Sequence, residues 1–139
     1  MRRLGALAAG LAWVAAAGVA GAAPAKDRVE ARYTPGYQRC LDAPVGGTTL
    51  GMKECAAAEL IIQDARLNAA YHKAMAELTA HQKAKLVTAQ RAWIAFRDAE
   101  CASYEDQDWG TLSQVNAAQC VVTMTVKRTI DLEAYPPGV

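Results

Sequence analysis

The chain has 139 residues, of which 15 are lysine or arginine and 14 are aspartate or glutamate. This length fits a single small domain. The near-neutral charge argues against nucleic acid or an anionic membrane surface as the main partner, because neither would attract the protein electrostatically.

The N-terminal segment has the pattern of a secretory signal peptide. Two arginines precede an uncharged run from Leu4 to Ala25 that is rich in small and apolar residues. The best cleavage site is Ala20-Gly21-Ala22, so we predict that residues 1–22 are removed and that the mature chain begins at Ala23.

The alternative is a retained membrane anchor, because the uncharged run is just long enough to span a bilayer. Its many alanines and glycines are less apolar than a typical anchor, and no cysteine follows it at a lipidation site. A periplasmic or secreted protein with no stable membrane insertion is therefore expected.

Residues 23–47 are predicted to form an irregular N-terminal arm. This segment contains three prolines and the pair Gly46-Gly47, and it shows no sustained periodicity. From residue 48 to residue 139 the composition changes and predicts a helical domain.

Two helical faces follow one another without an intervening glycine or proline. The spacings of three and four residues that define them are typical of a helix. The first face comprises Leu60, Asp64, Leu67, Tyr71, Met75 and Leu78, and the second comprises Leu86, Gln90, Trp93, Arg97 and Cys101. Between them, Thr79 and Gln82 have the spacing of a capping box, which predicts a new helix and a helical hairpin about Ala80.

A third helix is predicted after Gly110, where Thr111 and Gln114 have the spacing of a second capping box. The helix would end before Pro136-Pro137. Its apolar side would comprise Leu112, Val115, Val122, Val126 and Ile130. The sequence thus predicts an all-α, three-helix domain without strands.

The four cysteines predict two disulfides, because an even number in a small exported domain is typical of disulfide bonding. Zinc ligands usually come in close pairs, which are absent here. We predict Cys40–Cys55 and Cys101–Cys120, since each pair ties neighbouring segments. The competing pairing joins Cys55 to Cys101 and Cys40 to Cys120, and the hairpin permits it too.

The hairpin would place Asp64 opposite Arg97 as an interior ion pair, flanked by Tyr71 and Trp93. Such a pair would set the register of the helices, because removing one partner would leave a buried charge. The alternative is a catalytic carboxylate with an arginine clamp. No nucleophile or second acid shares the helical face, so the structural interpretation is favoured.

Other signs of chemistry are weak. His72 and His81 lack a metal-ligand pattern, and the chain has no G-x-S-x-G, Gly-rich phosphate loop or C-x-x-C motif. No cofactor or metal site is predicted. A glycosidase with paired carboxylates is disfavoured, because the acids near residues 100–108 lie at a helix end and in a loop, where solvent keeps them ionised.

The densest acidic segment is the candidate surface for binding a partner. It combines charge with aromatic side chains of the kind that dominate interfaces. Its members are Glu100, Tyr104, Glu105, Asp106, Asp108 and Trp109. The alternative is that the acids only solvate a loop between helices while Trp109 caps the bundle.

An ordered series of residues from Cys40 to Leu132 resembles the LprI-type lysozyme inhibitor family, long catalogued as a domain of unknown function. The series comprises Thr49, Met52 and Cys55, then Asp64, Leu67, Asn68 and Tyr71, then QRAWIAFRDAEC, Gly110, Cys120, Arg128 and Leu132. The resemblance implies an exported, disulfide-bonded helical domain, with lysozyme inhibition reported for the namesake. It also implies that Asp64, Asn68, Tyr71, Gln90, Trp93 and Arg97 serve the fold.

Three functional hypotheses follow. The first is an inhibitor that binds a lysozyme and protects peptidoglycan, without enzymatic activity of its own. The second is a periplasmic scaffold or adaptor for other envelope proteins. The third, and weakest, is a small hydrolase that uses Asp64.

Overall fold

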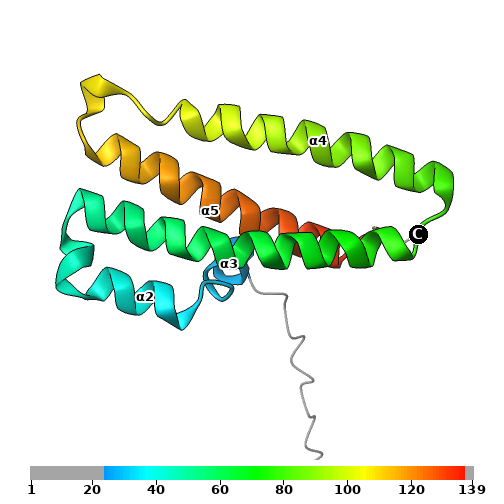
Figure 1. Cartoon of the computed structure of the whole chain (residues 1–139), viewed down its shortest axis with the longest axis horizontal. Coiled ribbons are helices and arrows are strands. Elements are labelled where there is room, and N and C mark those ends of the chain that lie inside the picture. Colours follow the sequence, from blue (N-terminus) through cyan, green and yellow to red (C-terminus); the bar gives the residue numbers. More distant parts are fainter. Residues whose placement is uncertain (1–23, 137–139) are drawn as a thin grey trace, which may run out of the picture.

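Three long helices form the body of the protein in a computed structural model that describes residues 24–136 (Figure 1). They are α3 (Thr49–Ala76), α4 (Ala80–Ala102) and α5 (Leu112–Glu133). Two short helices precede them, α1 (Ala25–Glu30) and α2 (Pro35–Asp42). The 3-10 helix η1 (Pro44–Gly47) lies between α2 and α3, and the 3-10 helix η2 (Gln107–Trp109) lies between α4 and α5. Residues 24–136 contain no strand, so the predicted all-α fold is confirmed.

The hairpin of α3 and α4 is open rather than closed. The two helices diverge from their connection, and α5 packs against both of them (Figure 1). The stripe on α4 that was expected to face α3 packs mainly on α5, since Gln90 accepts a hydrogen bond from Arg128 and Cys101 is bonded to Cys120. Within the described part of the chain, only Arg97 of this stripe reaches a side chain of α3 by an ion pair, that with Asp64.

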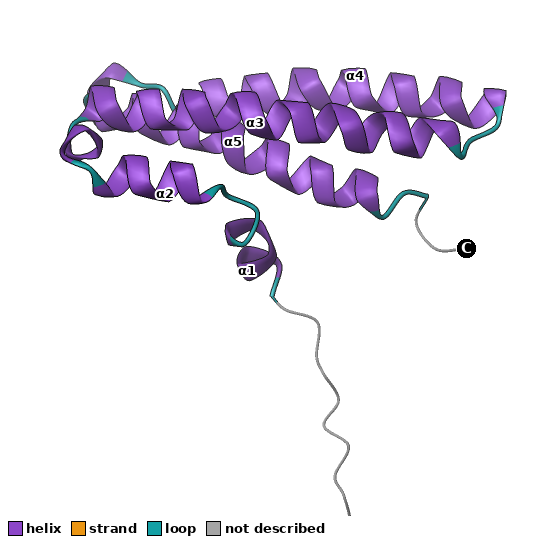
Figure 2. Cartoon of the chain, turned by 60° about the horizontal axis from the view of Figure 1, so that its bottom comes forward, coloured by secondary structure: helices purple, strands orange, loops and turns teal. Residues whose placement is uncertain are grey.

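The core lies mainly between α3 and α5. Small side chains at Ala70 and Ala74 of α3 are buried and allow the helices to approach closely. Leu67, Leu78, Leu86 and Leu132 complete this cluster. A second cluster joins Tyr37 of α2 to Cys55, Ala56 and Val122, so that α2 lies on the opposite side of the α3–α5 pair from α4 (Figure 2).

The segment predicted as an irregular arm contains α1 and α2. Thr34 caps α2 by accepting a hydrogen bond from the Tyr37 amide, and Pro35 occupies the first turn. The prolines therefore mark the starts of elements rather than a lack of structure. Helices of 6 and 8 residues are too short to show a periodicity in the sequence.

One of the two predicted capping boxes forms. Gln82 Oε1 accepts from the Thr79 amide at 2.9 Å, and Thr79 Oγ1 accepts from the Gln82 amide at 3.4 Å. The box predicted at Thr111 is wrong, because Thr111 has a helical conformation and its side chain makes no capping hydrogen bond. Gln114 instead accepts from Lys53 Nζ of α3 at 2.6 Å.

The apolar side predicted for α5 is correct at Val122 and Val126, which are fully buried. It is wrong at Leu112, which is 52% exposed. Leu112 is the first residue of α5 and directly follows the exposed connection from α4.

Both predicted disulfides are present. Cys40 is bonded to Cys55, and Cys101 is bonded to Cys120, with Cα–Cα distances of 5.7 and 5.4 Å. The first ties α2 to α3 and the second ties α4 to α5. The competing crossed pairing is excluded.

The predicted signal peptide, residues 1–22, and the predicted mature start at Ala23 lie outside the described residues. Among the helices of residues 24–136, none combines the length and the apolar character that crossing a membrane requires.

Glycines are required where η1 folds back on the start of α3. A Cβ atom built at Gly51 would lie 1.8 Å from the Val45 carbonyl oxygen, whereas one at Gly47 would meet nothing within 4 Å. We therefore expect Gly51→Ala to lower the free energy of unfolding by about 1 to 3 kcal/mol, because the backbone of η1 must move. Gly47→Ala is the matched control and should change it by less than about 0.5 kcal/mol. Urea unfolding followed by circular dichroism measures both, and equal values would contradict the close approach.

Candidate functional site

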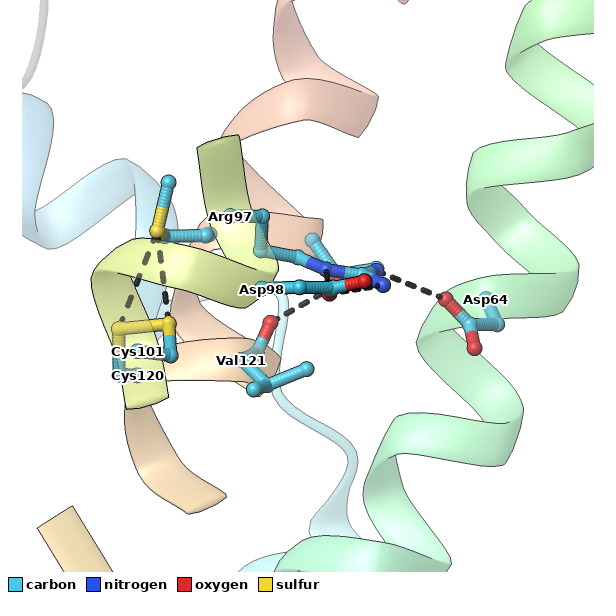
Figure 3. Close-up of polar contacts among 8 residues, drawn as sticks. Asp64, Arg97, Asp98, Cys101, Cys120 and Val121 are labelled. Atoms are coloured by element: carbon cyan, nitrogen blue, oxygen red, sulfur yellow. Dashed lines mark hydrogen bonds and ion pairs between the residues drawn. A yellow bond between two sulfur atoms is a disulfide. The ribbon is translucent and has the colours of Figure 1, made fainter. Parts of the chain in front are cut away.

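Arg97 on α4 extends across the space between the diverging helices toward Asp64 on α3 (Figure 3). Its Nη1 atom lies 3.8 Å from Asp64 Oδ1, so the predicted partners do meet. The nearer carboxylate is that of Asp98, 2.8 Å from Nη2. The Arg97 side chain is 15% exposed but that of Asp64 is 47% exposed, so the pair is only partly buried and the prediction of an interior pair is wrong for Asp64. Because solvent reaches the carboxylate, we expect the pair to contribute about 1 kcal/mol or less.

The rest of the stripe on α4 forms a connected network with α5. The Trp93 ring has the guanidinium carbons of Arg97 and Arg128 at 5.3 and 5.8 Å from its centroid, which is within cation–π range. Arg128 Nε donates to Gln90 Oε1 at 2.9 Å, and Arg97 Nη1 donates to Thr125 Oγ1 at 3.3 Å. These contacts hold α4 on α5.

An open groove of about 560 Å³ lies between α3 and α4 because the two helices diverge. The polar side chains that were predicted to lie in the interior line this groove instead. They are Asp64, Asn68, Tyr71, Gln90 and Arg97, together with Arg91. The only carboxylate among its lining residues is Asp64, which is already paired, so the groove adds no support for a hydrolase.

A buried carboxylate that the sequence analysis missed lies on α3. Glu59 is 1% exposed and has no cation beside it among residues 24–136. It accepts hydrogen bonds from the amide and the hydroxyl of Thr34, at 2.9 and 2.5 Å, and from Gln63 Nε2 at 2.6 Å. Three donors replace the water that this carboxylate loses on burial.

Glu59 and Gln63 thereby attach the start of α2 to α3. Gln63 also donates to the Arg32 carbonyl at 2.9 Å. The signal in the sequence was the spacing of four that places both residues in line with Cys55 and Leu67. This line is the most deeply buried face of α3, and it lies beside the face that was predicted to be buried.

Two further contacts hold the N-terminal segment to α5. Tyr37 hydrogen-bonds to Gln119, and burial raises the pKa of the Tyr37 hydroxyl, with Tyr33 and Glu59 adding to the effect. Arg32 donates to Glu133 near the end of α5 at 3.0 Å, and this hydrogen bond raises the pKa of the guanidinium. Both groups act as hydrogen-bond donors that join the N-terminal segment to α5.

The acidic segment predicted as a partner surface forms the connection between α4 and α5. Residues 102–112 are all exposed. Trp109 is 63% exposed, so it does not cap the bundle. The connection is ordered locally, because Asp106 Oδ1 accepts from the Asp108 amide at 2.8 Å and Gly110 turns the chain with a φ of 70°. We call residues 103–111 the acidic loop.

The acidic loop lies at the end of the bundle where α3 and α5 begin (Figure 1). The disulfide between Cys101 and Cys120 attaches the last turn of α4, just before the loop, to α5. Glu100, in the last turn of α4, lies just before the loop and is half-buried. The structure thus places five of the six candidate residues, all exposed, on one connection and the sixth, Glu100, in the helix just before it.

Residues 40–132 match the protein family described as lysozyme inhibitor LprI. The chain belongs to the LprI lysozyme inhibitor family. The matched range contains both disulfides, α3 and α4 in full and α5 up to Leu132, whereas α1 lies outside it. No curated protein and no solved structure matches the chain.

The residues that carry the resemblance to this family fall into two groups, one buried or crosslinked and the other exposed. Leu67, Leu132 and the cysteines build the core or its crosslinks. Asn68 is exposed at the α3–α4 groove, and Asp64 is about half exposed. Among residues 24–136, no group of three or more His, Cys, Asp or Glu side chains is placed to hold a metal ion.

The contrast between the two carboxylates of α3 can be measured. We expect Glu59→Ala to lower the free energy of unfolding by about 2 to 4 kcal/mol, because it leaves buried donors of Thr34 and Gln63 without an acceptor. Asp64→Ala is the control on the same helix and should cost about 1 kcal/mol or less. Urea unfolding of both variants checks this, and a larger loss for Asp64→Ala would restore the interior ion pair as the main polar constraint.

Proposed function

We propose that this protein is an exported inhibitor that binds a lysozyme, blocks it and so protects peptidoglycan, without chemistry of its own. The observation that carries the proposal is the match of residues 40–132 to the lysozyme inhibitor LprI family. The family description names inhibition, which requires a protein partner rather than a substrate.

The acidic loop is the proposed surface for that partner. Animal-type lysozymes are strongly basic and cleave a polysaccharide in an open cleft. Glu105, Asp106 and Asp108 supply negative charge that would steer such an enzyme toward the end of the bundle. Tyr104 and Trp109 are 42% and 63% exposed and would serve as aromatic anchors in the interface.

The order of the loop before binding also supports the proposal. The disulfide at Cys101 and the capping hydrogen bond of Asp106 restrict the loop in the free protein. Less conformational entropy is then lost on binding than for a flexible loop of the same length.

Export is part of the proposal. Two disulfides join all four cysteines, and disulfides persist in oxidising compartments such as a periplasm or the exterior. We expect the protein recovered from a periplasmic or secreted fraction to begin at Ala23, as measured by intact mass. A chain that retains Met1 would favour the anchored alternative.

Charge reversal in the acidic loop tests the function. We expect Glu105→Lys/Asp106→Lys/Asp108→Lys to abolish inhibition in a lysozyme assay while circular dichroism stays unchanged, because all three side chains are exposed. Inhibition by the parent should weaken as salt rises.

A matched control reverses three exposed acids outside the loop, Asp27, Glu77 and Asp131, and changes the net charge by the same amount. This variant should inhibit like the parent. Full inhibition by the loop variant would exclude the loop as the binding surface. A parent that inhibits no lysozyme would overturn the proposed function and leave an adaptor for other envelope proteins as the better hypothesis.

A further inference from the structure

A second groove, of about 520 Å³, runs along the seam between α4 and α5 on the surface of the bundle. It was not foreseen from the sequence. Its lining includes Phe96, Glu100 and Tyr104 from α4 and the turn after it, and Cys120, Met124 and Lys127 from α5. We call it the α4–α5 groove.

The aromatic side chains of this groove are unusually exposed. Phe96 is the only phenylalanine of the chain, and 56% of its surface is exposed. Tyr104 is 42% exposed. An aromatic side chain buries about 150 to 250 Å² when it is fully covered, and about half of that area remains exposed at Phe96 and Tyr104. Exposed apolar residues that gather at one place mark an interaction site.

The position of Phe96 separates it from the stripe that holds α4 on α5. Phe96 and Glu100 are four residues apart and share one side of α4, and Tyr104, in the turn after the helix, lines the same groove. The inward stripe, which includes Trp93 and Arg97, lies on a neighbouring side. Packing within the bundle therefore does not account for a phenylalanine at position 96.

The floor of the groove is covalently fixed. Cys120 lines it and is bonded to the buried Cys101. The Met124 sulfur lies 3.6 Å from Cys101 Sγ and 3.8 Å from Cys120 Sγ. A flexible thioether over a rigid crosslink can adapt to an inserted side chain while the groove keeps its shape.

The charged side chains around the groove are mainly negative, which favours a positively charged partner. Glu100 lies between the two aromatic residues, and the acidic loop with Glu105, Asp106 and Asp108 begins directly after Tyr104. The one basic residue of the lining is Lys127, which comes from α5. A ligand that covers both the groove and the loop therefore meets apolar surface bordered mainly by negative charge.

We propose that the α4–α5 groove receives an apolar side chain from a cationic protein, with Phe96 and Tyr104 as its anchors and the acidic loop holding the surrounding positive charge. This rests on the proposed function, in which the cationic protein is a lysozyme. Apolar contacts in the groove would then provide most of the binding free energy, and the charges of the loop would attract and orient the partner.

Isothermal titration calorimetry with hen egg-white lysozyme tests the groove. Phe96→Ala should weaken binding at least about tenfold, as expected for an anchor residue. The salt dependence of binding should match that of the parent, because no charge is removed. Ile61→Ala is the matched control, since Ile61 is an apolar residue of α3 that is 74% exposed and outside the groove, and it should bind within about twofold of the parent.

A second variant fills the groove instead of emptying it. Asn116 lines the groove and is exposed, so Asn116→Trp should occupy the space without loss of core packing and should also weaken binding at least about tenfold. If the parent binds lysozyme and both Phe96→Ala and Asn116→Trp bind equally well, the groove proposal is overturned while the inhibitor function stands. If the parent neither binds nor inhibits the enzyme, both proposals fall together.

Discussion

The packing of both α3 and α4 against α5 is the constraint on which the rest of the structure depends. The Cys101–Cys120 disulfide sets the position of α4 on α5, and the hydrogen bonds of Gln90 with Arg128 and of Arg97 with Thr125 set its register. Because α5 occupies the interior of the open hairpin, α3 and α4 face each other only across a groove. The partial exposure of Asp64, which meets Arg97 across this groove, follows from this arrangement.

The same packing separates the parts of the protein that support the fold from those available to a partner. The polar residues of the α4 stripe are used within the bundle, where Trp93 contacts two arginines. No helix of residues 24–136 buries the acidic loop, because it connects α4 to α5 at the end of the bundle. Negative charge and exposed aromatic side chains therefore gather at one end and along one seam, next to a disulfide that keeps both in place.

The N-terminal segment is joined to the bundle by polar contacts as much as by apolar ones. Glu59 is buried, yet its oxygens meet the amide and hydroxyl of Thr34, so the start of α2 can lie in only one position on α3. A buried polar group whose hydrogen bonds are all satisfied favours one arrangement, because any shift would leave a donor or acceptor unpaired. The Cys40–Cys55 disulfide ties the end of α2 to the same helix.

Local signals in the sequence determined much of this fold. Spacings of three and four residues define the long helices, and the Thr79 capping box separates α3 from α4. Both disulfides join segments that are neighbours in the chain, so their pairing could be predicted without knowing the packing. The series from Cys40 to Leu132 likewise indicated the family that the match of residues 40–132 shows.

Only the tertiary structure decided which helical face became the interior. On α3, the predicted face through Asp64 and the buried face through Glu59 differ by one residue and share Leu67. Both carry a carboxylate among apolar residues, so periodicity alone cannot separate them. The neighbours α2 and α5 make the choice, since Thr34 supplies the donors that allow Glu59, and not Asp64, to be buried. The α4–α5 groove depends on packing in the same way, because it exists only where the sides of two helices distant in sequence meet.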